Sequence, residues 1–241
     1  MLFRSLPNAT VLVHPRGAEH LVSPAKLAAS TIAVYGEKKF RQLYGEVIPI
    51  PRERIRVVED GERIVLGGSV FDVLHTPGHA LHHICLHDRD ANVLFTGDTF
   101  GISYRTFDTA KGAFIFPATT PTHFDPEQAH ASIDRLVSLN ADAAYLTHYG
   151  RVENLPEHAE TLHEDLAVFV EIARRCAEHE DRIEEMKRMM RAYLCARLDE
   201  HGFPDDARRD EWLAMDVDLN AKGLAAWLDR QARRAASVSA N

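Results

Sequence analysis

The stretch from His75 to Gly101, HTPGHALHHICLHDRDANVLFTGDTFG, constrains the fold of this chain more than any other part of the sequence. Two apolar segments, at residues 83–86 and 92–96, flank a short polar turn, which is the pattern of a β-hairpin in a partly buried sheet. His79 precedes the first segment in a turn made by a Pro and a Gly, and Asp98 follows the end of the second. The pattern therefore predicts an imidazole and a carboxylate at the strand ends of one sheet.

A third segment, residues 144–150, repeats this design, because an apolar strand is followed by His148 and then by a Gly. His79, Asp98 and His148 are thus predicted to stand at strand tips beside Gly-containing turns. A mixture of imidazole and carboxylate ligands suits zinc, iron or manganese. These three residues are therefore our candidate ligands for a divalent metal.

Most of the other histidines, of fourteen in the chain, fit strand ends, helix faces or solvent. Three of them, His75, His82 and His83, lie close to His79 in the sequence. They are candidates to orient the His79 imidazole through hydrogen bonds behind the metal ligands.

Charge and composition exclude several classes of partner. The net charge is −8 and no long Lys/Arg run offsets it, so we expect no nucleic-acid partner. No apolar run reaches the length of a membrane span, and residues 1–7 are too short for the apolar region of a signal peptide, so we expect no membrane partner and a cytoplasmic location. The cysteines have no CxxC spacing, and we interpret all three as buried or half-buried apolar residues: Cys85, Cys176 and Cys195.

Along the rest of the chain, strands and helices alternate up to about residue 155. The sequence predicts a strand at 10–13 closed by a turn at 14–17, helical pieces within 24–45, a hairpin over 55–66 with an Asp-Gly turn, a strand at 70–74 after a Gly-Gly turn, and a helix at 125–139. From Pro156 onward helix formers dominate and strand signals almost vanish. We therefore predict a first domain at residues 1–155 and a C-terminal helical extension at residues 156–241.

The segment from Gly101 to Phe124 predicts a long loop whose aromatic residues pack around a site. Tyr104 in this loop, or Tyr149 beside His148, could donate a hydrogen bond to a substrate; packing beneath the loop is the alternative for both. In the extension, a Met-rich stripe at residues 186–190 predicts core packing, with contact to a partner as the alternative.

These motifs, TPGH at 76–79, GDT at 97–99 and the His148 turn, resemble the later motifs of the metallo-β-lactamase superfamily. The resemblance covers roughly residues 8–155. It implies an α/β fold, namely a metallo-β-lactamase-like αββα sandwich with its metal site along one edge of the two sheets. It also implies that His79 binds a first metal, that Asp98 bridges two metals, and that His148 binds the second.

The function implied by this resemblance is that of a metal-dependent hydrolase. Metal-bound hydroxide would attack the carbonyl of an ester, thioester or lactone of a small metabolite, and Asp98 would hold the two divalent ions in place, zinc before iron or manganese. The small-molecule substrate is thus the expected partner. The helices after residue 156 resemble in position the C-terminal helices of hydroxyacylglutathione hydrolases (glyoxalase II), which help to bind substrate.

One departure from the family pattern leaves a second reading open. The family's HxHxDH motif, which supplies further metal ligands, does not occur in the sequence, and we expect the chain to begin inside the helix that follows that motif, so that the sandwich is N-terminally incomplete. The alternative is therefore a truncated or pseudoenzyme form that acts as a structural or interaction protein. An exposed sheet edge would then favour poor solubility or a homo-oligomer. A redox di-iron site on the same scaffold is a third option.

Overall fold

The computed structural model describes residues 6–119, 123–148 and 150–239. By its internal contacts the chain divides into two compact units, Met1–Glu62 and Arg63–Asn241. The first unit carries a small parallel sheet with short helices, and the second carries the main sheet, the candidate metal ligands and the C-terminal helices. No helix among the described residues is both long and apolar enough to cross a membrane.

In the first unit, strand β1 (Val11–Val13) pairs in parallel with β2 (Ile55–Val57). Parallel strands need a long crossover, and here it consists of α2 (Pro15–Val22), α3 (Ala25–Tyr35), α4 (Glu37–Tyr44) and the 3₁₀ turn η1 (Arg52–Arg54). The strand and the helical pieces predicted from the sequence are confirmed in this unit.

Two predictions for this region are wrong. Residues 14–17 do not close the strand as a turn, because His14 caps α2 by accepting a hydrogen bond from the Arg16 N–H at Nδ1 (3.0 Å), and Pro15 fits the first helical position. The predicted hairpin over 55–66 does not form either, since β2 pairs with β1 and the next strand belongs to the other unit. Its Asp-Gly turn is present, and Gly61 has a φ of +75°.

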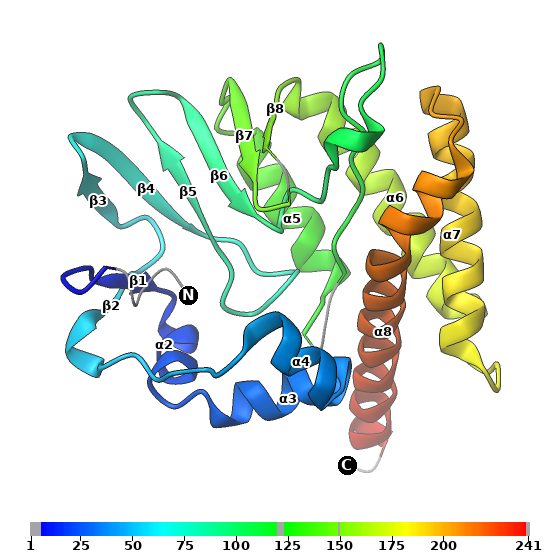
Figure 1. Cartoon of the computed structure of the whole chain (residues 1–241), viewed down its shortest axis with the longest axis horizontal. Coiled ribbons are helices and arrows are strands. Elements are labelled where there is room, and N and C mark those ends of the chain that lie inside the picture. Colours follow the sequence, from blue (N-terminus) through cyan, green and yellow to red (C-terminus); the bar gives the residue numbers. More distant parts are fainter. Residues whose placement is uncertain (1–5, 120–122, 149, 240–241) are drawn as a thin grey trace. The chain divides into compact units, whose positions relative to one another are not determined.

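The second unit is built on a six-stranded sheet in the order β3-β4-β5-β6-β7-β8 (Figure 1). The strands are β3 (Arg63–Leu66), β4 (Ser69–His75), β5 (Ile84–Asp88), β6 (Val93–Gly97), β7 (Ala143–Leu146) and β8 (Gly150–Val152). All neighbours are antiparallel except β6 and β7, which run in parallel and are connected through a helix. The predicted β5–β6 hairpin and the Gly-Gly turn before β4 are confirmed, whereas β8 was not predicted.

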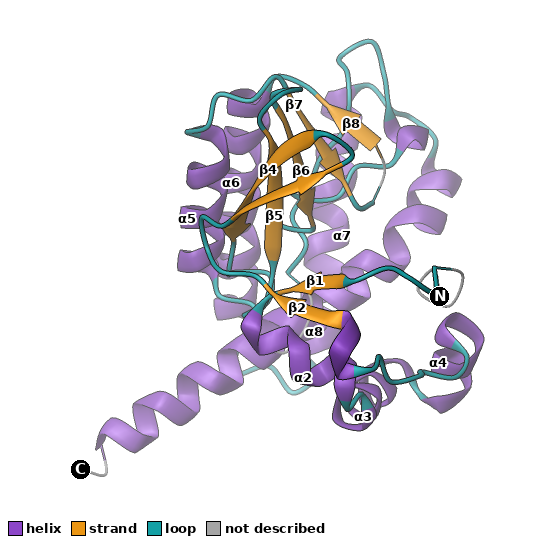
Figure 2. Ribbon diagram, turned by 90° about the vertical axis from the view of Figure 1, so that its left-hand side faces the viewer, coloured by secondary structure: helices purple, strands orange, loops and turns teal. Residues whose placement is uncertain are grey.

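Helices α5 (Pro126–Val137) and α6 (Leu155–Arg175) lie along one face of this sheet, as Figure 2 shows. That face presents buried side chains from alternate positions of the strands, among them Leu74, Cys85 and Leu94. Helix α5 begins where the sequence predicts, because the Asp125 carboxylate accepts a hydrogen bond from the Gln128 N–H (3.1 Å).

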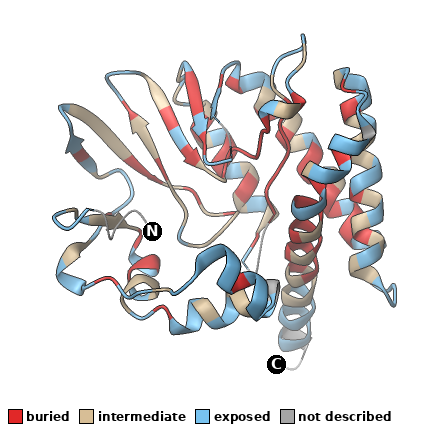
Figure 3. Ribbon diagram, viewed as in Figure 1, coloured by how far each residue is buried: buried red, intermediate tan, exposed pale blue. Residues whose placement is uncertain are grey.

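Two further helices, α7 (Arg182–His201) and α8 (Asp206–Ser239), complete the same core. Figure 3 shows buried residues concentrated on α6 and on the part of α8 that precedes its exposed end. Met186 and Met190 are fully buried and Met189 packs against the core, so core packing of the Met stripe is confirmed and partner contact is wrong. The domain boundary at residue 155 stays a prediction.

The segment between β6 and α5 contains the 3₁₀ turn η2 (Arg105–Phe107) and packs its aromatic residues inward, as predicted. Four of its phenylalanines are almost completely buried: Phe107, Phe114, Phe116 and Phe124. Tyr104 is 6% exposed and its hydroxyl donates a hydrogen bond to Asp216 Oδ2 (2.7 Å), which supports the packing interpretation. Tyr149 lies outside the described residues.

Candidate metal centre

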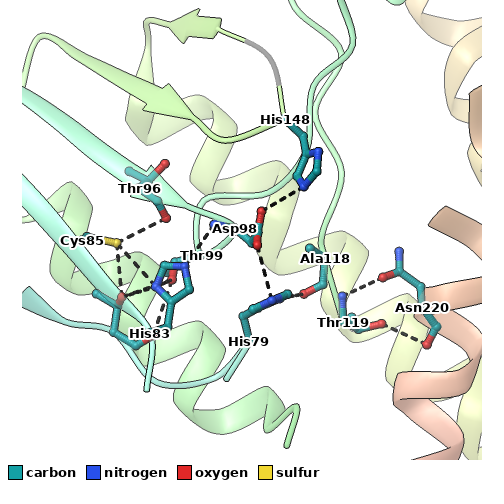
Figure 4. A network of polar contacts seen from close by, with 11 residues as sticks. His79, His83, Cys85, Thr96, Asp98, Thr99, Ala118, Thr119, His148 and Asn220 are labelled. Atoms are coloured by element: carbon teal, nitrogen blue, oxygen red, sulfur yellow. Dashed lines mark hydrogen bonds and ion pairs between the residues drawn. The ribbon is translucent and has the colours of Figure 1, made fainter. Parts of the chain in front are cut away.

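The three predicted ligands come together at one edge of the main sheet (Figure 4). Because β6 and β7 are parallel neighbours, the residues that follow them, Asp98 and His148, meet at the same end. His79 follows β4 in the turn that leads to β5. Its Nε2 lies 3.5 Å from Asp98 Oδ2, and His148 Nε2 lies 3.4 Å from Asp98 Oδ1.

The His79 imidazole is fixed by a hydrogen bond at its other nitrogen. Nδ1 lies 3.1 Å from the carbonyl oxygen of Ala118, and a carbonyl can only accept, so Nδ1 carries the proton. In the neutral ring Nε2 is then a lone pair that faces a carboxylate oxygen. Two acceptors in this arrangement require a cation between them, either a proton or a metal ion.

The turn that carries His79 is held on α5. The Ser132 hydroxyl donates to the Pro77 carbonyl (2.6 Å), and the Asp125 N–H donates to the Gly78 carbonyl (2.8 Å). A Cβ at Gly78 would lie 2.5 Å from the Cα of Ala129, and the φ of Gly78 is +133°. Only glycine allows the turn to approach the helix this closely.

Behind the ligands, His83 supports the backbone of Asp98. Its Nε2 accepts a hydrogen bond from the Asp98 N–H (3.1 Å), so Nδ1 carries the proton and lies 2.9 Å from the hydroxyls of Thr76 and of Thr99. Burial, aided by the nearby His79, lowers the pKa of His83 to about 4. His83 is therefore neutral at neutral pH and holds Asp98 from behind, the role predicted for a neighbour of His79. For His75 and His82 that role stays a prediction.

Whether these residues fit a metal is decided by Asp98. Its Oδ1 is buried and has no hydrogen-bond partner among the described residues, a costly arrangement for a carboxylate unless a cation satisfies it. Two ligands bound about 2.1 Å from one tetrahedral metal lie about 3.4 Å apart. Both imidazole-to-carboxylate separations match this spacing, and each uses a different oxygen of Asp98. The donor set therefore fits divalent metal ions.

The described part of the chain supplies only part of a metal coordination sphere. Within it, no group of three or more His, Cys, Asp or Glu side chains gathers where a single ion could bind them all. Each imidazole instead shares only Asp98. A space of about 10 Å³ beside His79 and Asp98, walled by apolar residues such as Phe124 and Leu162, is about the size of one water molecule or ion.

Sequence reasoning missed two contributors to this site. The Ala118 carbonyl has no side-chain signal, and Asp216 lies on α8, far from the motifs in sequence. Asp216 is buried, which raises its pKa, and the charges of His148 and Asp98 also act on it. Helix α8 further anchors the Ala118 segment through Asn220, as Figure 4 shows.

The order of the motifs has a counterpart among known families. Residues 2–148 match the model of the family described as the metallo-beta-lactamase superfamily. The chain belongs to this superfamily. Solved structures of the superfamily confirm the predicted fold class: an archaeal member from Sulfolobus tokodaii is 27% identical, with a TM-score of 0.56 over 70% of this chain and 61% of that one. A member from Thermus thermophilus is 19% identical and shows the same fold, with a TM-score of 0.57 over 96% of this chain and 69% of that one.

Sequence relatives within the superfamily are hydrolases. A hydroxyacylglutathione hydrolase from Pseudomonas aeruginosa is 38% identical over 100 residues, which are 41% of this chain and 34% of that enzyme. An acyl-coenzyme A thioesterase from Bos taurus is 50% identical over 42 residues, which are 17% of this chain and 15% of that enzyme. The chain thus matches about a third of the first relative and less of the second.

Proposed function

We propose that this chain acts as a metal-dependent hydrolase on the thioester of a small metabolite. The observation that carries the proposal is the pair of imidazoles, His79 and His148, that face separate oxygens of Asp98 at 3.5 and 3.4 Å. Both hydrolase relatives are named for thioester substrates, which favours a thioester over the ester and lactone alternatives. Zinc is the proposed metal, with iron and manganese as alternatives, and a cytoplasmic location remains part of the proposal.

In this function each residue has a defined task. A bound divalent ion would polarise the carbonyl and lower the pKa of water. Asp98 would offer one oxygen to each imidazole position, and the Ala118 carbonyl keeps the proton of His79 on Nδ1 so that Nε2 is available as a ligand. Neutral His83 keeps the Asp98 backbone in place without adding positive charge beside the metal.

Metal content and thioester hydrolysis test the proposal together. We expect purified chain to retain zinc by elemental analysis after dialysis and to hydrolyse acetyl-coenzyme A or S-lactoylglutathione, and Asp98→Asn to lose both properties. The matched control is Asp134→Asn, because Asp134 also contacts a histidine, His163 (2.9 Å), but lies outside the site. Equal loss in both variants would contradict the assignment of Asp98.

A second candidate function is a structural or interaction protein without hydrolase activity. It is favoured by one observation, that the described residues bring no three potential ligands around one ion. Under this reading, metal content would stay near zero and Asp98→Asn would change neither thioester hydrolysis nor thermal stability in the presence of zinc.

A further inference from the structure

A second cavity of about 620 Å³ lies in the larger unit, away from the strand tips that carry the metal ligands. It is bordered by the loop around Lys111, by the residues that connect β8 with α6, and by the C-terminal part of α7. This volume is within the range of small-molecule sites in proteins. Six of its lining side chains are basic: Arg105, Lys111, Arg151, Arg197, His158 and His201.

The charge of this cavity is opposite to that of the chain. Four permanently positive side chains line it against two carboxylates, Glu153 and Glu157, whereas the whole chain carries a net charge of −8. Glu153 forms an ion pair with Arg151, and Asp108 at the loop forms one with Arg105. The cavity therefore keeps an excess of positive charge after these pairs are counted.

Arg197 gives the cavity a fixed cation. It forms an ion pair with the fully buried Asp165, donates to the Ile115 carbonyl (3.2 Å), and places its guanidinium 4.8 Å from the centre of the Phe114 ring. A guanidinium held in this way loses little conformational freedom when it meets a ligand. Lys111 is also positioned, through a hydrogen bond to the Glu200 carbonyl (2.5 Å).

The two histidines report the same positive environment. Burial lowers the pKa of His158; His201 and Arg197 lower it further, while Glu157 opposes them. Burial also lowers the pKa of His201, with Arg197 and Lys111 acting in the same direction and Asp108 and a hydrogen bond to the Gly112 carbonyl (3.2 Å) acting against it. An anion between these groups would favour their charged forms.

We propose that this cavity binds a small metabolite through a phosphate group. A phosphate monoester carries about two negative charges, which matches the excess of permanent cations better than a single carboxylate does. Planar guanidinium groups such as those of Arg105, Arg151 and Arg197 can each contact two phosphate oxygens. The site does not depend on the proposed hydrolase function, because no candidate metal ligand lines it.

The test uses inorganic pyrophosphate as the probe, titrated calorimetrically into the full chain at low ionic strength without added metal. We expect saturable binding that Lys111→Gln weakens by about two- to fivefold, as loss of one partly exposed charge predicts. Glu157→Gln should strengthen binding by a similar factor. The matched control is Arg188→Gln, which removes an equal charge from an exposed ion pair with Glu185 outside the cavity and should leave affinity unchanged.

A second readout locates the probe. Bound pyrophosphate should raise the pH at which the His158 and His201 imidazole signals titrate in NMR spectra, and high salt should reduce this shift. Absence of saturable binding, or equal weakening by Arg188→Gln, would overturn the proposal. Tricarballylate binding as tightly as pyrophosphate would show that the cavity prefers carboxylates and would overturn the phosphate assignment.

Discussion

Asp98 is positioned mainly through its backbone. Its N–H donates to His83 Nε2, and the preceding Gly97 has a φ of +51°. A Cβ at Gly97 would lie 2.4 Å from His83 Nε2. The residue before the carboxylate must therefore tolerate both a left-handed backbone and direct contact with the imidazole, which only glycine does.

Replacement of Gly97 tests this argument. We expect Gly97→Ala to lower the free energy of unfolding by more than Gly112→Ala, in urea titrations at neutral pH. Gly112 also has a positive φ, +99°, but a Cβ there would meet nothing within 4 Å, so it reports the backbone strain alone, about 1–3 kcal/mol. Equal losses in the two variants would show that the His83 contact does not constrain Gly97.

The proximity of His79, Asp98 and His148 could be predicted from the sequence, because each follows an apolar strand and stands beside a glycine turn. Their role as metal ligands stays a prediction. The choice of His83 among the neighbours of His79 could not be made, since it depends on which imidazole reaches the Asp98 N–H. The Ala118 carbonyl carries no side-chain signal at all.

Among the elements, α8 holds the loop that orients His79. The Asn220 side chain accepts from the Thr119 N–H (2.7 Å) and donates to the Pro117 carbonyl (3.0 Å), while the Thr119 hydroxyl donates to the Asn220 carbonyl (3.1 Å). All of these groups are buried. The C-terminal helix thus fixes the residues on both sides of Ala118.

We expect Asn220→Ala to lower the free energy of unfolding by about 1–3 kcal/mol, because it leaves buried partners unsatisfied. It should also weaken zinc binding, since the Ala118 carbonyl would lose its support. Asn220→Asp keeps the acceptor for the Thr119 N–H and removes only the donor, so it should reduce zinc affinity less. Zinc titration of both variants measures this, and equal affinity in Asn220→Ala and the unmodified chain would contradict it.

Helices α6 and α7 are joined by a buried carboxylate whose effect depends on pH. Burial raises the pKa of Asp165 to about 6 from an ordinary value of 3.8, although Arg197 and the Tyr193 hydroxyl act in the opposite direction. The native state therefore binds this proton more tightly than the unfolded chain. The stability that it contributes is fully present below pH 3.8 and is lost as the pH rises through about 6.

Asp165→Asn cannot titrate, so the comparison isolates this contribution. As the pH rises from about 5 to about 7, the free energy of unfolding of the unmodified chain should fall relative to the variant by about 1 kcal/mol. Urea unfolding at both pH values measures the difference. A difference that does not change with pH would mean that Asp165 is already ionised in the native state at the lower value.

Local elements were predictable where the signal was local. The β5–β6 hairpin and the capped start of α5 follow from short patterns that the structure retains. The Asp-Gly turn after β2 forms too, but strand pairing depends on distant partners, and β1 takes up β2 instead. Helix α2 was missed because a Gly at its third position resembles a turn signal.

For the whole molecule, the main sheet ends in an edge strand. Among the described residues β3 pairs only with β4, and its Val65 and Leu66 are 73% and 69% exposed. An exposed apolar edge is a template for pairing with another chain. A second copy of this chain is the expected occupant, as the homo-oligomer predicted from the sequence.

Sedimentation velocity over a range of concentrations tests this expectation. The unmodified chain should self-associate, and Val65→Lys should shift it toward the monomer because a charge on an edge strand opposes pairing. Met215→Lys, which places the same charge at an exposed position of α8, should leave association unchanged. A monomer at all concentrations in the unmodified chain would contradict the expectation.

The segment between β6 and α5 serves two places at once. Arg105 and Lys111 on it line the basic cavity, and Ala118 further along it accepts the His79 proton. Any free energy that this segment transmits between them must act equally in both directions. If an oxyanion in the cavity tightens zinc binding by some factor, zinc must tighten oxyanion binding by the same factor, so cellular levels of the two ligands would jointly set the occupancy of each.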